Sequence, residues 1–160
     1  MAGDDAALIS SSRAVVDSYK KQDANVEKFL SSAEGYAVFP NIIKGGFIFG
    51  GAGGDGILFE HGKPVGKASL GQASVGFQLG GQSFSEVIFF ENASTLNEFK
   101  NGNFALAAQA SAVALSAGGA AAAKYQNGVA IFVATKSGLM YEASVGGQKF
   151  GYQPLGAQKK

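Results

Sequence analysis

From Tyr36 onward the sequence consists of short apolar runs separated by glycine, and this pattern limits the folds available to the chain. The 160 residues include 24 glycines. Short apolar runs bounded by turn residues are typical of β-strands, and glycine permits tight turns and close approach of neighbouring backbones. The pattern predicts strands at 36–39, 46–50, 56–60, 64–70, 73–79, 83–91, 128–135, 138–145 and 147–153.

Residues 104–116 fit two kinds of secondary structure. Their alternation, which includes Phe104, Leu106 and Ala108, favours a strand, whereas their alanine content favours a helix. We expect a strand and keep the helix as the alternative. The longer stretch 104–123 carries no charge and is nominally long enough to cross a membrane. Because Ala, Ser and Gly give little transfer energy, we expect a packed internal element there and not a transmembrane helix.

The N-terminal residues 4–33 have the periodicity of an amphipathic helix, which residues 23–25 can break into two. Steps of three and four along one helix face select Leu8, Ser12, Val15, Tyr19, Gln22, Val26 and Phe29. The opposite face mixes acidic and basic residues, which favours a helix packed on a sheet over a helix lying on a membrane surface. A second, shorter helix is predicted at 92–99, with Asn92 or Ser94 as its cap.

These elements predict one α+β domain that covers residues 1–160. A helical segment at 4–33 would form a layer against a glycine-rich strand region at 36–153. Short strands at steady spacing favour a curved, mostly antiparallel sheet or a partly closed barrel. A hydrophobic content of 46% is sufficient for a sizeable core in a chain of this length.

Composition argues against several functional classes. The net charge is +1, so the chain lacks the basic footprint of a nucleic-acid-binding protein. Arg13 is the single arginine, and there is no cysteine for a disulfide, a thiol nucleophile or a zinc finger. The first residues, MAGDD, contain no basic segment followed by an apolar one, so the printed sequence predicts no signal peptide.

The glycines Gly51, Gly53 and Gly56 have the spacing G-x-G-x-x-G of a dinucleotide-binding loop. Such a loop needs a helix directly after it, because the helix N-terminus holds the pyrophosphate. Here the next residues, ILFE, read as a strand, so we predict no nucleotide site. We interpret the glycines as a hairpin with its turn at 50–55. The alternative is a nest of backbone N–H groups that binds an anion with the help of Lys44.

Two ionisable residues were considered for catalysis. His61 is the single histidine and lies in a polar stretch, EHGKP, which favours an exposed turn residue. Glu86 lies among apolar residues, which leaves a raised pKa open, but a solvent-facing strand residue is the simpler interpretation. No G-x-S-x-G motif occurs, and no second carboxylate is placed to form an acid/base pair with Glu86. The sequence therefore predicts no enzyme, no cofactor and no metal site.

Three lysines are the candidates for binding an anionic ligand. Lys44, Lys63 and Lys67 each lie in or beside a glycine-rich turn. A phosphate at such a turn can reach both an ammonium group and backbone N–H groups, and lysines near a membrane attract anionic lipid. Ordinary solvated lysines are the alternative interpretation.

Three long segments resemble the SYLF domain family, whose eukaryotic members are described as lipid- and actin-binding. They are AEGYAVFPNIIKGGFIFGGAGGDGILF at 33–59, GQASVGFQLGGQSFSEVIFFENASTLNEFKNGNFALAAQASAVA at 71–114, and NGVAIFVATKSGLMYEASVGGQKFGY at 127–152. Their order and spacing agree with the family over roughly residues 5–153.

The resemblance implies a non-enzymatic module that binds phosphoinositides or other anionic lipids at a membrane surface. Within FPNIIKGGF, the resemblance implies that Lys44 is the basic residue that contacts the lipid headgroup. As a stand-alone domain, the chain is similar to family members from the bacterial cell envelope. The resemblance therefore implies a periplasmic or membrane-associated location, after removal of a signal that the printed sequence does not contain. The second hypothesis is a protein-interaction or structural module of the envelope without lipid preference.

Overall fold

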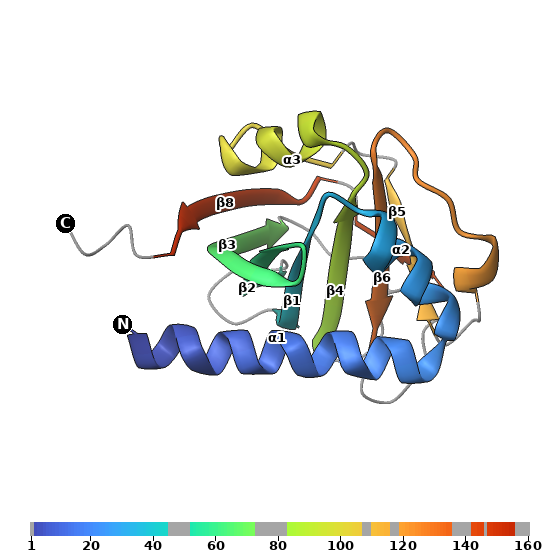
Figure 1. Cartoon of the computed structure of the whole chain (residues 1–160), viewed down its shortest axis with the longest axis horizontal. Coiled ribbons are helices and arrows are strands. Elements are labelled where there is room, and N and C mark those ends of the chain that lie inside the picture. The colour runs from blue at the N-terminus through green and yellow to red at the C-terminus, as the bar shows by residue number, and fades with distance from the viewer. Residues whose placement is uncertain are drawn as a thin grey trace.

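The computed structural model describes residues 2–44, 52–72, 83–106, 110–115, 119–135, 142–145 and 147–155. The fold has three layers: the sheet lies in the middle, with α1 on one side of it and α3 on the other (Figure 1). The helical elements are α1 (Ala2–Gln22), η1 (Ala24–Val26), α2 (Glu27–Ser32), α3 (Ala93–Lys100) and η4 (Gly119–Ala122). The strands are β1 (Gly35–Lys44), β2 (Ala52–Glu60), β3 (Lys63–Gln72), β4 (Ser83–Phe90), β5 (Ser111–Ala114), β6 (Val129–Ala134), β7 (Glu142–Ser144) and β8 (Lys149–Pro154).

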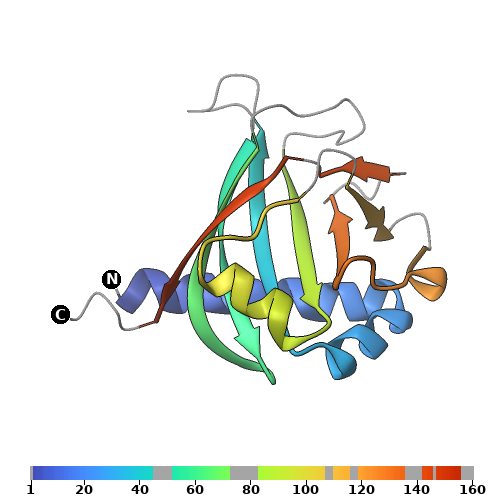
Figure 2. The same ribbon diagram turned by 90° about the horizontal axis from the view of Figure 1, so that it is seen from above.

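The described strands form one open, mixed sheet in the order β7-β5-β6-β4-β1-β2-β3-β8. Neighbouring strands are antiparallel except β5 and β6, which are parallel. The two edge strands, β7 and β8, are consecutive in the chain, so residues 145–148 connect the two ends of the curved sheet (Figure 2). The predicted α+β fold, with a curved and mostly antiparallel sheet beside an N-terminal helical layer, is confirmed.

Both faces of the sheet are buried, each in its own hydrophobic cluster. On the α1 face, Tyr19 and Phe29 pack against strand residues such as Phe89 and Phe132. On the α3 face, the core includes Leu96, Phe99, Phe104 and Phe150 together with alternate strand residues. A strand that is covered on both faces reads as a nearly continuous apolar run, which explains the sequence VIFF in β4.

The helical prediction for 4–33 is confirmed, and so is its break. Asp23 ends α1, and its carboxylate accepts a hydrogen bond from the backbone N–H of Asn25 at 3.0 Å, which caps the short helix η1. Along the predicted apolar face, Tyr19 and Phe29 are buried, but Gln22 is exposed. The buried face of α1 therefore ends before Gln22, the last residue of the helix.

Most predicted strands agree with the structure, with two corrections. The first strand continues beyond Phe39 to Lys44, because a β-bulge takes Pro40 into the strand. Of the residues that the structure describes within 104–116, which exclude 107–109 and 116, Ser111–Ala114 form a strand. The predicted strands at 46–50 and 73–79, and residues 138–141 of another, lie outside the described residues.

The predicted hairpin turn at 50–55 is wrong from residue 52 onward, since these residues already belong to β2. The glycines there serve close packing between strands. A Cβ atom on Gly56 would collide with the carbonyl oxygen of Val38 and the ring of Phe39, and one on Gly54 would lie 2.7 Å from the carbonyl oxygen of Asn41. Glycine at these positions therefore lets β2 approach the bulged part of β1.

Candidate functional site

Several strands end together on one side of the sheet, which we call the Lys44 end. The register pairs Lys44 with Ala52, Ala52 with Gln72, and Ile43 with Ser83, so these strand ends are adjacent. Ile43 is 51% exposed and is the large hydrophobic residue that stands out on the surface of the described part. The Lys44 end therefore combines a basic residue in the strand with an exposed apolar side chain beside it.

The other two candidate lysines lie elsewhere. Lys63 is exposed and pairs in register with Glu60, at the hairpin that carries His61. Eight residues of β2 separate the partner of Lys44 from the partner of Lys63, which corresponds to about 26 Å of extended strand. One lipid headgroup cannot contact both lysines. Because successive turns of an antiparallel meander alternate between the two ends of a sheet, the sequence already contained a signal for this separation.

Lys67 points from β3 toward the helical layer. Its ammonium group lies 3.8 Å from the carboxylate of Asp5 on α1, and its side chain is 40% exposed. On the same face, the Arg13 guanidinium lies 5.4 Å from the ring centroid of Phe59 and donates a hydrogen bond to the carbonyl of Gly62 at 3.4 Å. These two cations contact both α1 and the sheet, and the three candidate lysines do not form one cluster.

His61 is exposed and occupies the β2–β3 turn with a φ of 53°. The interpretation of His61 as an exposed turn residue is confirmed.

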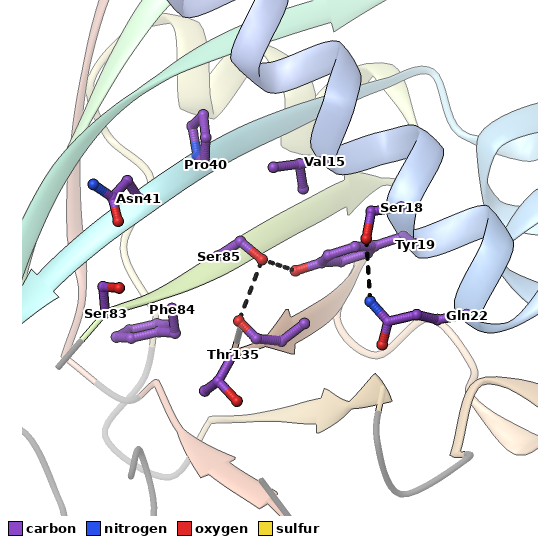
Figure 3. Close-up of a pocket in the computed structure, with 11 residues that line it drawn as sticks. Val15, Ser18, Tyr19, Gln22, Pro40, Asn41, Ser83, Phe84, Ser85 and Thr135 are labelled. Atoms are coloured by element: carbon purple, nitrogen blue, oxygen red, sulfur yellow. Dashed lines mark hydrogen bonds between the residues drawn. The ribbon is translucent and has the colours of Figure 1, made fainter. Parts of the chain in front are cut away.

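A small pocket lies between α1 and the strands near the Lys44 end, and we call it the Tyr19 pocket (Figure 3). Its volume is about 150 Å³. It is lined by Val15, Ser18, Tyr19, Gln22, Pro40, Asn41, Ser83, Phe84, Ser85, Ala134 and Thr135. Tyr19 is buried and Ser85 is partly buried in this pocket, whereas Asn41 is exposed at its rim.

Hydrogen bonds hold the polar groups of the Tyr19 pocket in place. The Tyr19 and Ser85 hydroxyl oxygens are 2.8 Å apart, and the Ser85 hydroxyl donates to the carbonyl of Ala134 at 3.3 Å. Since Ser85 has one hydrogen to donate, Tyr19 must donate to Ser85. Burial raises the pKa of the Tyr19 hydroxyl far above its usual value, although its bond to Ser85 opposes this effect. Tyr19 is therefore a neutral hydrogen-bonding group and not an acid or base.

The β1 bulge shapes one wall of the Tyr19 pocket. Phe39 pairs with Glu86 and Ile42 with Phe84, so β1 contains one more residue than β4 over this stretch. Proline cannot donate a ladder hydrogen bond, and inside a sheet it is found at bulges or edges. Sequence reasoning placed Tyr19 on a buried helix face but missed this pocket. The signal that could have found it is Pro40 at the end of an apolar strand.

Glu86 is fully buried on the α3 face, so its interpretation as a solvent-facing residue is wrong. Its carboxyl oxygen Oε1 accepts a hydrogen bond at 2.9 Å from Nε2 of Gln148, which also donates to Gln72 at 3.1 Å. We call these three residues the Glu86 cluster. Burial raises the pKa of Glu86 to about 8, against the lowering effect of the Gln148 hydrogen bond. Glu86 is therefore largely protonated at neutral pH.

The Glu86 cluster connects distant parts of the fold. Gln148 belongs to the connection between the two edge strands, whereas Glu86 lies in β4 and Gln72 at the end of β3. The second carboxyl oxygen of Glu86 and the amide oxygen of Gln148 are buried without a hydrogen-bond partner. The sequence could not identify the cluster, because 62 residues separate Glu86 from Gln148.

A larger groove of about 620 Å³ lies between α3, the start of β6 and the segment before β5. This volume is within the usual range for ligand pockets. Six alanines, at positions 105, 110, 112, 122, 123 and 130, line the groove, and Glu98 and Lys124 are its charged lining residues.

Within the described residues, no group of three or more His, Cys, Asp or Glu side chains is placed to hold a metal ion. In the same ranges, no helix combines the length and the apolar character that a membrane crossing requires.

Comparison with known protein families gives one match. Residues 71–153, slightly more than half of the chain, match the family described as Ysc84, Las17-binding protein actin regulator. The matched region runs from the end of β3 to β8 and includes Ser85 and Glu86. This match confirms the resemblance to the SYLF domain family. A search of curated proteins found no match.

Proposed function

The chain belongs to the Ysc84 (SYLF) family, and from this premise we propose that it is a non-enzymatic module that binds anionic, phosphoinositide-like lipid headgroups at a membrane surface. The family description names a binding protein, which supports a binding role in general. The proposed contact region is the Lys44 end of the sheet. The bacterial cell envelope, with a periplasmic or membrane-associated location, is the compartment that we propose with it.

The observation that carries this proposal is the exposure of Ile43 directly before Lys44. An exposed aliphatic side chain gains free energy when it leaves water for the acyl region of a bilayer. A lysine beside it adds about 1 kcal/mol when it lies close to an anionic surface. Insertion of Ile43 and charge attraction to Lys44 would then act at the same strand end.

The positions of the other lysines refine the proposal. Lys63 lies at the opposite end of the sheet, and Lys67 is paired with Asp5 on the helical face. We therefore expect Lys44 to contact the headgroup, and we expect Lys63 and Lys67 to add only long-range attraction. Such attraction is weakened by salt, because the Debye length is about 8 Å at physiological ionic strength.

Liposome co-sedimentation tests the proposal with single variants. Vesicles of neutral lipid are compared with vesicles that contain phosphatidylserine or a phosphoinositide, at low and physiological salt. We expect Ile43→Ser and Lys44→Ala to weaken binding to acidic vesicles, and the matched variant Lys63→Ala to leave it nearly unchanged. Equal losses in Lys44→Ala and Lys63→Ala would point to non-specific attraction. Absence of binding to every vesicle would exclude the lipid function.

The groove beside α3 favours a second candidate, a protein-interaction or structural module of the envelope without lipid preference. Its volume of about 620 Å³ and its alanine-rich lining suit a partner segment. A pull-down without liposomes tests this candidate, with Ala112→Phe as the variant that fills the groove. Capture of a partner by the wild-type chain, but not by the filled variant, is the expected result if this second function is correct.

A further inference from the structure

We propose that the Tyr19 pocket is a binding site for an uncharged six-membered ring that carries hydroxyl groups, such as the pyranose ring of a sugar. This inference goes beyond the proposed function, because it concerns a neutral ligand and does not require anionic lipid. Three features carry it: the chemistry of the lining, the direction of its hydrogen bonds, and its size and rigidity.

The lining suits a neutral, hydroxylated ligand. None of its residues carries a charge, and its polar side chains are hydroxyls, amides and a phenol. A phosphate or carboxylate in this pocket would lose hydration without gaining a cationic partner, which is costly. The remaining lining residues are apolar and include Val15, Pro40 and Phe84. A sugar ring has both parts, since its C–H groups can contact apolar residues while its hydroxyls form hydrogen bonds.

The hydrogen bonds inside the pocket leave both donors and acceptors for a ligand. Tyr19 donates to Ser85, and Ser85 donates to the carbonyl of Ala134, so both hydroxyl oxygens keep capacity to accept. The Ser18 hydroxyl oxygen accepts from the Gln22 amide at 3.3 Å, and its hydrogen can be donated. Asn41 at the rim has an amide that can donate and accept (Figure 3). Sugar hydroxyls, which both donate and accept, match this arrangement.

The size and rigidity of the pocket fit one ring. Its volume of about 150 Å³ is similar to that of an engineered cavity that holds benzene, so the pocket can take in one edge of a pyranose ring while the outer hydroxyls stay at the exposed rim near Asn41. Tyr19 is 1% exposed and hydrogen-bonded, and the wall beside it is a bulged strand of the sheet. Because these groups are already fixed, binding would not require them to be ordered.

The ring could belong to a soluble sugar or to the headgroup of a neutral glycolipid. The pocket lies close to the Lys44 end, since Asn41 and Ser83 both line it. A glycolipid at a membrane surface could reach the pocket from that end. The two sources share the same chemistry, and separate arms of one experiment distinguish them.

The test is a titration of the whole ¹⁵N-labelled chain with methyl α-D-glucopyranoside and methyl β-D-galactopyranoside, followed by amide chemical shifts. We expect saturable shifts around Tyr19, Asn41 and Ser85 for at least one sugar. Glucose 6-phosphate should bind no more tightly than the neutral sugars. A parallel arm compares neutral vesicles with and without a galactosyl diacylglycerol, which identifies a lipid source independently of anionic lipid.

Removing a hydroxyl in the pocket should weaken sugar binding by about two- to tenfold, the range for one hydrogen bond. The variants are Tyr19→Phe and Ser85→Ala. The chain offers a matched control in Tyr125→Phe, because the hydroxyls of Tyr125 and Ser32 are also 2.8 Å apart and line no part of this pocket. The control should bind like the wild type.

Asn41→Trp provides a variant at an exposed position, where loss of folding is not expected. The added ring should block the rim and abolish the shifts while the rest of the amide spectrum stays unchanged. Absence of saturable shifts with both sugars would overturn the proposal. It would also be overturned if Tyr125→Phe weakened binding as much as Tyr19→Phe. Neither result depends on whether the chain binds anionic vesicles, so the two proposals fail separately.

Discussion

Ser85 and Glu86 are neighbours in β4, yet they point to opposite faces of the sheet and meet different surroundings. Ser85 faces α1, where it exchanges hydrogen bonds with Tyr19 and the Ala134 carbonyl. Glu86 faces the α3 side, where Gln148 satisfies one of its oxygens and the other has no partner. Both polar groups lie beside aromatic cores. The Tyr19–Ser85 pair is neutral and insensitive to pH, whereas the stability of the fold depends on whether the Glu86 carboxyl group is protonated.

This difference shows that burial alone does not decide the role of a polar group. A buried hydroxyl pair needs only geometry, because both of its members are neutral over the physiological range. A buried carboxyl group must keep its proton, since a charge without a cationic partner is strongly disfavoured in an apolar interior. The following predictions test the comparison of the two faces, and they begin with the largest expected effect.

The apolar cores on the two faces should contribute equally to the free energy of unfolding. Phe89 contacts Phe29 and Phe132 on the α1 face, whereas Phe90 contacts Phe99 and Phe104 on the α3 face. Both side chains are at most 1% exposed. Phe89→Ala and Phe90→Ala should each lower the free energy of unfolding by about 3–5 kcal/mol, through lost transfer energy and the cavity left behind. Denaturant titration measures this, and a loss below about 1 kcal/mol on one face would break the symmetry.

Only the α3 face should make stability depend on pH near neutrality. The folded protein holds the Glu86 proton up to a pKa of about 8, whereas the ordinary value is 4.5. Between these values the folded state binds more protons than the unfolded state, so stability falls as pH rises, by at most about 1.4 kcal/mol per pH unit. This contribution is complete below the ordinary pKa and is lost as pH rises through the folded one.

Glu86→Gln removes the titrating group and keeps an oxygen that can accept from Gln148. Its stability should therefore change less with pH than that of the wild type, and it should be the more stable of the two at alkaline pH. Denaturant titrations of both proteins from pH 5 to pH 9 measure the difference. Parallel curves for the two proteins over this range would exclude the proposed role of Glu86.

The hydroxyl pair on the α1 face should have a smaller and constant effect. Tyr19→Phe removes one hydrogen bond and keeps the ring, so we expect a loss of about 1 kcal/mol in the free energy of unfolding. Because burial raises the pKa of Tyr19 far above its usual value, the loss should be the same at pH 6 and pH 8. Denaturant titration at both values tests this, and a marked pH dependence would contradict the neutral interpretation of the pair.

The smallest effect is expected for the ion pair between Lys67 and Asp5. The ammonium and carboxylate groups are 3.8 Å apart and partly exposed to solvent, and such pairs typically contribute less than about 1 kcal/mol. Lys67→Ala should change the melting temperature by only a few degrees, and less at high salt. A large loss, of the size expected for the aromatic cores, would mean that this contact is essential for holding α1 on the sheet.

The residues with the largest expected effects, those of the apolar core, are also the ones whose burial could be predicted from the sequence. The apolar run in β4 predicted a strand, and the periodicity around Tyr19 and Phe29 predicted a buried helix face, because burial of apolar surface leaves a repeating pattern in the chain. The same local patterns predicted the helix break at Asp23. Where a competing rule acted, the prediction was wrong, as at Pro40, which ended the predicted strand although a bulge takes it into β1.

By itself, the sequence determined the α+β class, the helical layer, most strands and the family, since each depends on residues that are near one another or in a fixed order. Only the tertiary structure decided that both faces are buried, that Gln148 reaches Glu86, and that Lys67 lies beside Asp5 of α1. These features depend on contacts between segments far apart in the chain, and local residue patterns carry no record of such distances.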